Sequence, residues 1–347
     1  MYESFYGFSE RPFELTADAK YLFLRTRQRE ALSILQYGLF AAKTLTVLIG
    51  EAGTGKTTLI RAALESERCR HVRCIYLNNP ALDTDDFIRQ LALKFDLGPE
   101  AGESKALFLV RLELLLRERQ ACGETTALVI DEAQSLSVKL LEEIRLLANI
   151  ETPSAKLLPL VLAGQPELGA RLEHPDLRQL KQRVTLRCDL EPFNLADTAA
   201  YIASRISTAG GVASSVFSRE AVTLIHEYSG GIPRSISVIC DNALMNAMAL
   251  GRQKVDQAIV VEVGRDLRLK ARREQQPSSF RSGELPAESH DSTTHSIDRD
   301  KTAELDENTA HVQNPWEATV SSNRNPVPLD APVLPLRSRG AGRFITE

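Results

Sequence analysis

The chain has 347 residues, of which 43% are hydrophobic and 25% are charged, and its formal net charge is −4 at pH 7. This length allows two domains with hydrophobic cores of their own, and the composition is ordinary for a globular protein. The net charge excludes a chain-wide basic field of the kind that marks a nucleic-acid-binding protein, although it leaves room for a local basic patch.

Short apolar runs alternate with helical patterns over the first half of the chain. The strand candidates are Thr44–Ile49, His71–Leu77, Ala127–Ile130, Leu157–Ala163 and Val184–Cys188, and the helix candidates between them are Arg27–Ala41, Thr57–Ser66, Thr84–Phe95, Lys105–Ala121 and Val138–Asn149. Strands that alternate with helices indicate βαβ crossovers. We therefore predict an α/β fold over residues 1–193, with a mainly parallel sheet covered by helices on both faces.

The strand patterns stop after residue 193. Residues 194–270 contain four helical patterns, at Leu195–Ala209, Ser218–Tyr228, Pro233–Leu250 and Asp256–Leu269. They predict a small all-helical lid domain. Residues 271–347 are rich in Ser, Thr, Pro and acidic residues without periodicity, which predicts a disordered tail. The tail is either a linker or a docking segment that acts through Trp316 or the Pro-Leu run near its end.

A phosphate-binding loop is the strongest motif in the sequence. Residues 50–57 read GEAGTGKT, which matches GxxxxGK[ST] between a predicted strand and a predicted helix. Glycines let such a loop wrap a phosphate with its N–H groups, and the helix N-terminus attracts the negative charge. Lys56 is expected to reach the β- and γ-phosphates, and the Thr57 hydroxyl to complete the shell of Mg²⁺. The predicted nucleotide-binding residues are Gly50, Glu51, Ala52, Gly53, Thr54, Gly55, Lys56, Thr57 and Thr58.

Two acidic residues end the predicted strand at Ala127–Ile130. A carboxylate at the tip of a buried strand is costly unless it faces a cation or hydrogen-bond donors. Asp131 therefore suits Mg²⁺, and Glu132 suits the general base that polarises the attacking water. Gln165 ends another apolar strand. If that strand lies between the two motif strands, its amide can sense the γ-phosphate; otherwise Gln165 only begins the next loop.

Four arginines are candidates for contact with phosphate. Arg183 precedes the last predicted strand and is favoured over Arg178 and Arg187 as a finger that reaches the γ-phosphate of a neighbouring subunit. The alternative is a solvated basic face. Arg234, in GGIPR, opens a predicted helix, where a cation opposes the helix dipole unless an anion such as the γ-phosphate compensates it.

Two further segments have competing interpretations. The N-terminal aromatic residues Tyr2, Phe5, Tyr6, Phe8, Phe13, Tyr21 and Phe23 lack interleaved basic residues, so packing against the α/β domain is favoured over base stacking. The basic stretch Arg265–Arg273 is either a solvated helix end or a contact for phosphates or anionic lipid.

No apolar stretch approaches the roughly 18–20 residues that span a bilayer, and the N-terminus lacks the apolar region of a signal peptide. The five cysteines form no CxxC pair, which is typical of a reducing compartment. We expect a soluble cytoplasmic protein that reaches the inner membrane, if at all, through a partner.

In their order, these motifs resemble those of AAA+ ATPases. The opening MYESFYGFSERPFELTADAKYLFL and the segment LAGQPELGARLEHPDLRQLKQRV are similar to ExeA/GspA-type ATPases, over about residues 1–270. The resemblance implies ATP and Mg²⁺ as cofactors and ATP hydrolysis as the activity. It also implies a homo-oligomer whose active site is completed by the neighbouring subunit. It assigns Lys56 and Thr57 to phosphate and metal, Asp131 to the metal and Glu132 to catalysis. Gln165 would be sensor 1, Arg183 the finger and Arg234 sensor 2.

The family energises secretion, pilus or exopolysaccharide export machines, so the resemblance implies an envelope or secretion protein as partner. Many members continue into a membrane helix and a peptidoglycan-binding region; this chain has a polar tail in their place, which favours an ATPase that serves such a machine from the cytoplasm. Related ATPase regulators of transposition share the core. The alternative function is therefore a DNA-bound, ATP-dependent switch, and a third is a nucleotide-gated interaction module without hydrolysis.

Overall fold

The computed structural model describes residues 1–15, 21–78, 82–153 and 155–270. The described residues belong to one compact unit. The predicted tail, residues 271–347, lies outside the described part of the chain. The boundary predicted between residues 193 and 194 stays a prediction, because contacts join the regions on either side of it.

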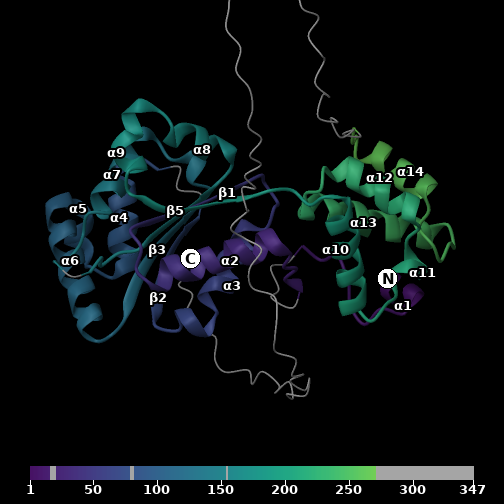
Figure 1. The fold of residues 1–347 in the computed structure, drawn as a ribbon, viewed down its shortest axis with the longest axis horizontal. Coiled ribbons are helices and arrows are strands. Elements are labelled where there is room, and N and C mark those ends of the chain that lie inside the picture. The colour runs from purple at the N-terminus through teal and green to yellow at the C-terminus, as the bar shows by residue number, and fades with distance from the viewer. Residues whose placement is uncertain (16–20, 79–81, 154, 271–347) are drawn as a thin grey trace, which may run out of the picture. The chain divides into compact units, whose positions relative to one another are not determined.

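Five parallel strands form a single sheet in the order β2-β3-β4-β1-β5 (Figure 1). The strands are β1 (Leu45–Gly50), β2 (Val72–Asn78), β3 (Thr125–Asp131), β4 (Leu160–Gly164) and β5 (Val184–Leu190). The predicted parallel sheet is confirmed. Strand β4, which Gln165 follows, lies between β3 and β1. The carboxyl ends of these three parallel strands therefore meet at the same end of the sheet.

Helices cover both faces of the sheet, and alternate strand residues point to each face. One face carries α2 (Thr26–Phe40) and α3 (Lys56–Leu64), which pack on side chains such as Leu48 and Val129. The other face packs through Val47 and Ile130 against a second group of helices. This group contains α4 (Thr84–Phe95), α5 (Pro99–Glu103), α6 (Lys105–Ala121), α7 (Val138–Leu147), α8 (Pro166–Leu172) and α9 (Arg178–Lys181). Figure 1 shows the two helical layers on either side of the strands.

Only helices follow the sheet among the described residues after 193. They are α10 (Leu195–Thr208), α11 (Ala213–Val216), α12 (Arg219–Ser229), α13 (Pro233–Ala249) and α14 (Gln257–Asp266). Side chains of Asn194, Ser218 and Asp256 cap three of these helices by accepting a hydrogen bond from the amide three residues on. The four predicted helices are therefore confirmed, while the short α11 was not predicted. No helix in the described ranges is long and apolar enough to cross a membrane.

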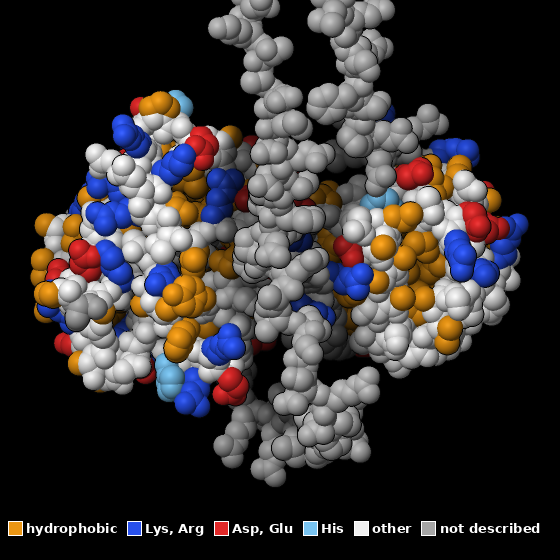
Figure 2. Space-filling model, in the orientation of Figure 1, with side chains coloured by type: hydrophobic (Ala, Val, Ile, Leu, Met, Phe, Trp, Pro, Cys, Tyr) orange, Lys and Arg blue, Asp and Glu red, His pale blue; other side chains and the backbone are white. Residues whose placement is uncertain are grey.

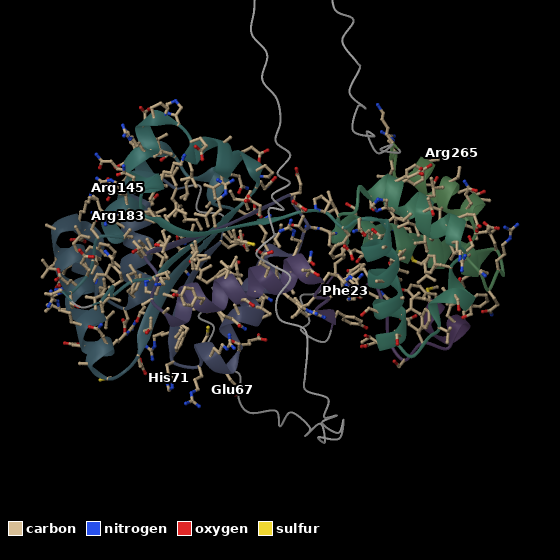
Figure 3. The ribbon with its side chains drawn as sticks, viewed as in Figure 1. Phe23, Glu67, His71, Arg145, Arg183 and Arg265 are labelled. Carbon is tan, nitrogen blue, oxygen red and sulfur yellow. The ribbon has the colours of Figure 1, made fainter. Side chains whose placement is uncertain are left out.

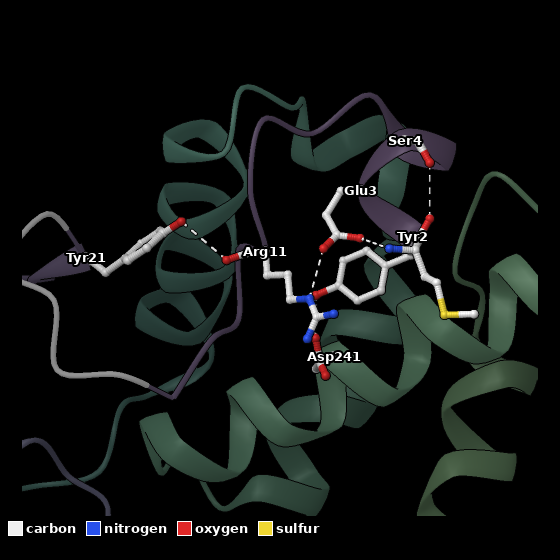
Figure 4. Close-up of polar contacts among 7 residues, drawn as sticks. Tyr2, Glu3, Ser4, Arg11, Tyr21 and Asp241 are labelled. Atoms are coloured by element: carbon white, nitrogen blue, oxygen red, sulfur yellow. Dashed lines mark hydrogen bonds and ion pairs between the residues drawn. The ribbon is translucent and has the colours of Figure 1, made fainter.

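The N-terminal segment packs on these helices. Helix α1 (Tyr2–Tyr6) is anchored by the Tyr2 hydroxyl, which donates to the carboxylate of Asp241 in α13. Arg11 Nε donates to Glu3 at 2.9 Å, and the Tyr21 hydroxyl donates to the Arg11 carbonyl at 3.3 Å (Figure 4).

The prediction that the N-terminal aromatic residues pack on the α/β region is wrong. Tyr2, Phe8 and Phe13 are buried in one core with α10, α12 and α13. Phe23 packs edge-on against Phe193 and Tyr201 of that same core, with ring centroids 5.6 Å apart in each pair. The reason is spatial: helices already cover both faces of the sheet, so the apolar surface left open for the aromatic segment is that of the helical region.

Candidate nucleotide site

The phosphate-binding loop joins β1 to α3. Gly53 and Gly55 have φ angles of +83° and +95°, which L-residues with a side chain rarely adopt. Gly55 is the N-cap of α3, so the first amides of this helix point into the loop. The Thr54 hydroxyl closes the turn by donating to the Glu51 carbonyl at 2.8 Å. The loop therefore has the backbone conformation and the free helix N-terminus that an anion requires.

Lys56 is nearly buried, at 5% exposure. Its ammonium donates to the carbonyls of Gly50 at 2.8 Å and Glu51 at 3.1 Å. Burial lowers the pKa of Lys56, and the carboxylates of Glu132 and Asp131 oppose this effect. The site thus holds a poorly solvated cation beside the loop, which an anionic ligand would stabilise.

Thr57 and Asp131 meet as a metal site requires. The Thr57 hydroxyl donates to Asp131 Oδ2 at 2.6 Å, and Asp131 is 2% exposed. The described residues contain no group of three or more His, Cys, Asp or Glu side chains that could hold a metal ion by itself. One carboxylate and one hydroxyl, with phosphates supplying further oxygens, are a donor set that suits Mg²⁺.

Glu132 follows in a left-handed backbone conformation, with φ of +54°. Its Oε2 accepts hydrogen bonds from Gln165 Nε2 at 3.2 Å and from Gln134 Nε2 at 2.5 Å. The sheet order meets the condition set for Gln165, since β4 lies between β3 and β1. The structure therefore brings Glu132 and Gln165 together at the edge of the sheet that carries the loop.

Gln134 is a site residue that the sequence reasoning missed. Its Oε1 accepts from the Gln165 amide at 3.0 Å, and its carbonyl accepts from Arg171 Nη1 at 2.7 Å. It therefore ties Glu132 to the end of β4 and to α8. The sequence did contain a hint of this role, because Gln134 follows Glu132 by two residues and so stays close to the acidic pair. In the structure it lies in the short 3₁₀ helix η3 (Ala133–Ser135).

Arg234 lies against the loop. Its amide donates to the Gly53 carbonyl at 3.2 Å, and a Cβ added to Gly53 would lie 2.7 Å from Arg234 Cβ. Its side chain is exposed. Three residues before Arg234, the backbone of Gly231 packs closely against that of Phe193. The φ angle of Gly231 is +73°, and a Cβ there would lie 2.0 Å from the Phe193 carbonyl oxygen. The start of α13 is thus fixed beside the phosphate loop.

Arg183 lies away from the chain's own loop. Val184, which follows it, pairs with Leu45 at the start of β1, whereas the loop follows Gly50 at the end of that strand. Five residues of extended chain span about 17 Å. In the view of Figure 3, the labelled Arg183 and Arg145 both lie in the part of the molecule that carries α7 and α9. Arg183 therefore contributes nothing to the site of its own chain, and a finger role needs a second subunit.

The two alternative finger residues have other surroundings. Arg187 Nε lies 3.2 Å from Asp189 and its Nη1 lies 3.8 Å from Glu173, so its charge is already paired. Arg178 is exposed at the start of α9. Burial lowers the pKa of Lys156, and the nearby charge of Arg183 lowers it further.

A pocket adjoins the loop on the side of the N-terminal segment. Its lining includes Thr54, Gly55 and Thr58 from the loop and α3, Leu22 and Phe23 from the N-terminal segment, and Pro233. Two nearly buried polar residues also line it, and the sequence reasoning missed both: Gln28, at 6% exposure, and Arg205, at 7%. Gln28 Oε1 and Arg205 Nη1 have no hydrogen-bond partner among the described residues. Such atoms are costly to bury unpaired, and a ligand or a water in this pocket could offer them a donor and an acceptor.

The chain is similar in sequence to known proteins. Residues 41–172 match the family described as AAA domain. The chain is 41% identical over 257 residues to general secretion pathway protein A of Aeromonas hydrophila; the match covers 74% of this chain and 46% of that protein. The chain therefore spans about half the length of this relative.

Solved structures share the fold at low sequence identity. Cdc6p of Pyrobaculum aerophilum superposes with a TM-score of 0.58 at 21% identity, over 74% of this chain and 70% of that one. The ORC2 protein of Aeropyrum pernix, in complexes with ADPNP and ADP, gives a TM-score of 0.54 at 18% identity, over 74% and 71% of the two chains. The predicted P-loop fold is thus confirmed.

Proposed function

We propose that this chain, which belongs to the AAA-domain P-loop family of the ExeA/GspA type, binds ATP with Mg²⁺ and hydrolyses it to ADP and phosphate. One observation carries the proposal. Lys56, the Thr57–Asp131 pair and the Glu132–Gln165 pair, which are far apart in sequence, converge at the edge of the sheet where the phosphate loop opens.

Binding of the phosphates rests on the loop and on Lys56. The amides of residues 53–57 and the N-terminus of α3 would donate to phosphate oxygens. The Lys56 ammonium, which now donates to two loop carbonyls, would turn to the β- and γ-phosphates. Thr57 and Asp131 would hold Mg²⁺, which neutralises charge on the phosphates when bound.

Hydrolysis rests on Glu132. Gln134 and Gln165 hold one oxygen of its carboxylate, and the other stays free to accept a proton from the attacking water. Gln165 would then report the state of the γ-phosphate to α8 through the contact that Gln134 makes with Arg171. Arg234, whose exposed side chain begins beside Gly53, would stabilise the γ-phosphate.

The pocket beside the loop supports ATP as the nucleotide. Adenine offers an amino group as donor and ring nitrogens as acceptors. These would pair with the orphaned Gln28 Oε1 and Arg205 Nη1, respectively. Phe23 and Leu22 supply the apolar walls that a base requires. The similar fold of the ORC2 protein was solved with adenine nucleotides, which agrees with this assignment.

The site is completed by a second copy of the chain in our proposal. Arg183 lies before the amino end of β5, whereas Lys56 lies beyond the carboxyl end of the neighbouring strand β1. Only a neighbouring subunit could therefore bring Arg183 to a γ-phosphate. An arginine in this role would make hydrolysis depend on protein concentration, because a monomer lacks the finger.

The process served is proposed from the relative's name. The name general secretion pathway protein A points to a secretion machine as partner. Pilus or polysaccharide export as variants, and inner-membrane association through that partner, are our own extension of this proposal. The DNA-switch alternative rests on the basic stretch Arg265–Arg273. Arg265, near the end of α14, and Arg268 and Lys270, just after it, are exposed, while residues 271–273 lie outside the described part of the chain. The face seen in Figure 2 carries basic, acidic and apolar side chains. We favour the protein partner because the similar protein is named for a secretion pathway.

The test is ATP binding and turnover by the purified chain. We expect Mg²⁺-dependent hydrolysis by the wild type, and loss of nucleotide affinity in Lys56→Ala. Addition of duplex DNA at low and high salt separates the alternatives, because phosphate-dominated binding weakens steeply with salt. Salt-sensitive stimulation by DNA would favour the switch. Equal nucleotide affinity in wild type and Lys56→Ala would overturn the proposal.

A further inference from the structure

Asp131 accepts a hydrogen bond from a residue that lies outside the sequence motifs. The hydroxyl of Tyr76, in the edge strand β2, donates to Asp131 Oδ2 at 2.6 Å. Thr57 Oγ1 donates to the same oxygen at 2.6 Å. The other oxygen, Oδ1, accepts from the Glu132 amide at 2.9 Å. The carboxylate of Asp131 is thus held by three donors from three different segments.

These three donors decide which oxygen can serve a metal. A carboxylate oxygen accepts about two hydrogen bonds through its lone pairs. Oδ2 is filled by the two hydroxyls, whereas Oδ1 keeps one lone pair free. Because Tyr76 in β2 and Thr57 in α3 approach Oδ2 from two different elements, the carboxylate cannot rotate without breaking at least one of these bonds.

We propose that Tyr76 is a positioning residue for magnesium, whose hydroxyl saturates Asp131 Oδ2 and so presents Oδ1 to the metal or to its bound water. The inference rests on the proposed function, since it names a further residue of the same site. Tyr76 does not touch the nucleotide in this account. It acts on the metal through Asp131, as groups behind metal ligands commonly do.

The surroundings of Tyr76 suit this role. Its ring packs partly buried against the core under α2 and α3, so the side chain has a fixed direction. Its hydroxyl lies 2.6 Å from Asp131 Oδ2, so the ring directs its donor at that oxygen.

The test compares wild type with Tyr76→Phe, which keeps the ring and removes only the donor. Affinity for ATP is measured by calorimetry in EDTA and then over a series of Mg²⁺ concentrations. We expect equal affinity in EDTA, and about 10- to 100-fold more Mg²⁺ for half of the magnesium-dependent gain in the variant. A purely structural role would instead shift the affinity in EDTA and the thermal midpoint.

The matched control is Tyr6→Phe, which removes a tyrosine hydroxyl bonded to carbonyls of Leu244 and Arg252 in the helical region. It should leave the Mg²⁺ requirement unchanged. An equal Mg²⁺ requirement in wild type and Tyr76→Phe would overturn the inference alone. A wild type whose nucleotide affinity ignores Mg²⁺ would overturn both the inference and the proposed function.

Discussion

The amide of Arg234 donates a hydrogen bond to the carbonyl of Gly53 across 3.2 Å. This bond joins the first turn of α13 to the middle of the phosphate loop, although 181 positions separate the two residues in the sequence. Any ligand that reshapes the loop must therefore keep this bond or release the start of α13. The contact would couple a nucleotide bound at the loop to the start of the helical region.

Gly231→Ala should damage this junction more than its backbone conformation alone explains. An alanine at positive φ costs about 1–2 kcal/mol. The new Cβ would also lie 2.0 Å from the Phe193 carbonyl oxygen, and overpacking typically adds about 1–3 kcal/mol. Urea unfolding measures the loss in free energy. The control is Gly251→Ala, which has φ of +67° with nothing within 4 Å of the added Cβ. Equal losses in the two variants would contradict the clash.

Gln134→Ala should slow hydrolysis while leaving ATP affinity close to that of wild type. Without Gln134 the carboxylate of Glu132 loses its shortest hydrogen bond and the Gln165 amide loses its acceptor. A misplaced catalytic group costs about 100-fold in rate. Steady-state kinetics separates kcat from KM. The control is Gln182→Ala, an exposed residue after α9. An unchanged kcat would show that Gln134 does not hold Glu132.

ATP binding should be coupled to proton uptake where the pH reaches the lowered pKa of Lys56. Burial lowers the pKa of Lys56 in the free protein, and phosphate oxygens at the ammonium would raise it again. Between those two values the complex binds more protons than the free protein, so affinity falls as pH rises through the pKa of free Lys56.

Calorimetry in two buffers of different ionisation enthalpy measures this uptake. The control is Lys56→Arg, because a guanidinium stays charged and removes the uptake even if affinity falls. Identical binding enthalpies in both buffers for the wild type would contradict a Lys56 that is partly neutral before ATP binds.

Gln28 should let the protein distinguish ATP from ITP, which carries a carbonyl where adenine has its amino group. In the ITP complex, the carbonyl of the base and Gln28 Oε1 would both be acceptors, so Gln28 Oε1 would stay buried without a partner. We expect this to lower the affinity for ITP by about 10-fold or more. Gln28→Leu should bring the ratio of the two affinities close to one. Gln36→Leu, on the same helix but outside the pocket, should keep it. If wild type bound ITP as tightly as ATP, Gln28 would not recognise the adenine amino group.

The sequence was sufficient for features that depend on local pattern. The loop at 50–57 and the acids at 131–132 follow apolar strands, so period and spacing alone located them. Gln134, Tyr76, Gln28 and Arg205 carry no such pattern. Each gains its importance from a partner far away in the chain, as Tyr76 does from Asp131, and a single sequence does not reveal such pairs.

The N-terminal aromatic segment illustrates the same limit. Its residues predict burial but not the surface that buries them, because several irregularly spaced aromatic side chains fit either region. The bond between Tyr2 and Asp241, near the two ends of the described chain, decides in favour of the helices. The role of Arg183 likewise depends on a second subunit, which one chain does not contain.

The most direct test of the account is a single-turnover assay of radiolabelled ATP on wild type and Glu132→Gln at equal, high protein concentration. The account predicts that wild type converts bound ATP to ADP. It also predicts that Glu132→Gln binds ATP with near wild-type affinity but hydrolyses it at least about 100-fold more slowly. Conversion at equal rates in the two proteins, or tight binding of ATP without conversion by the wild type, would contradict it.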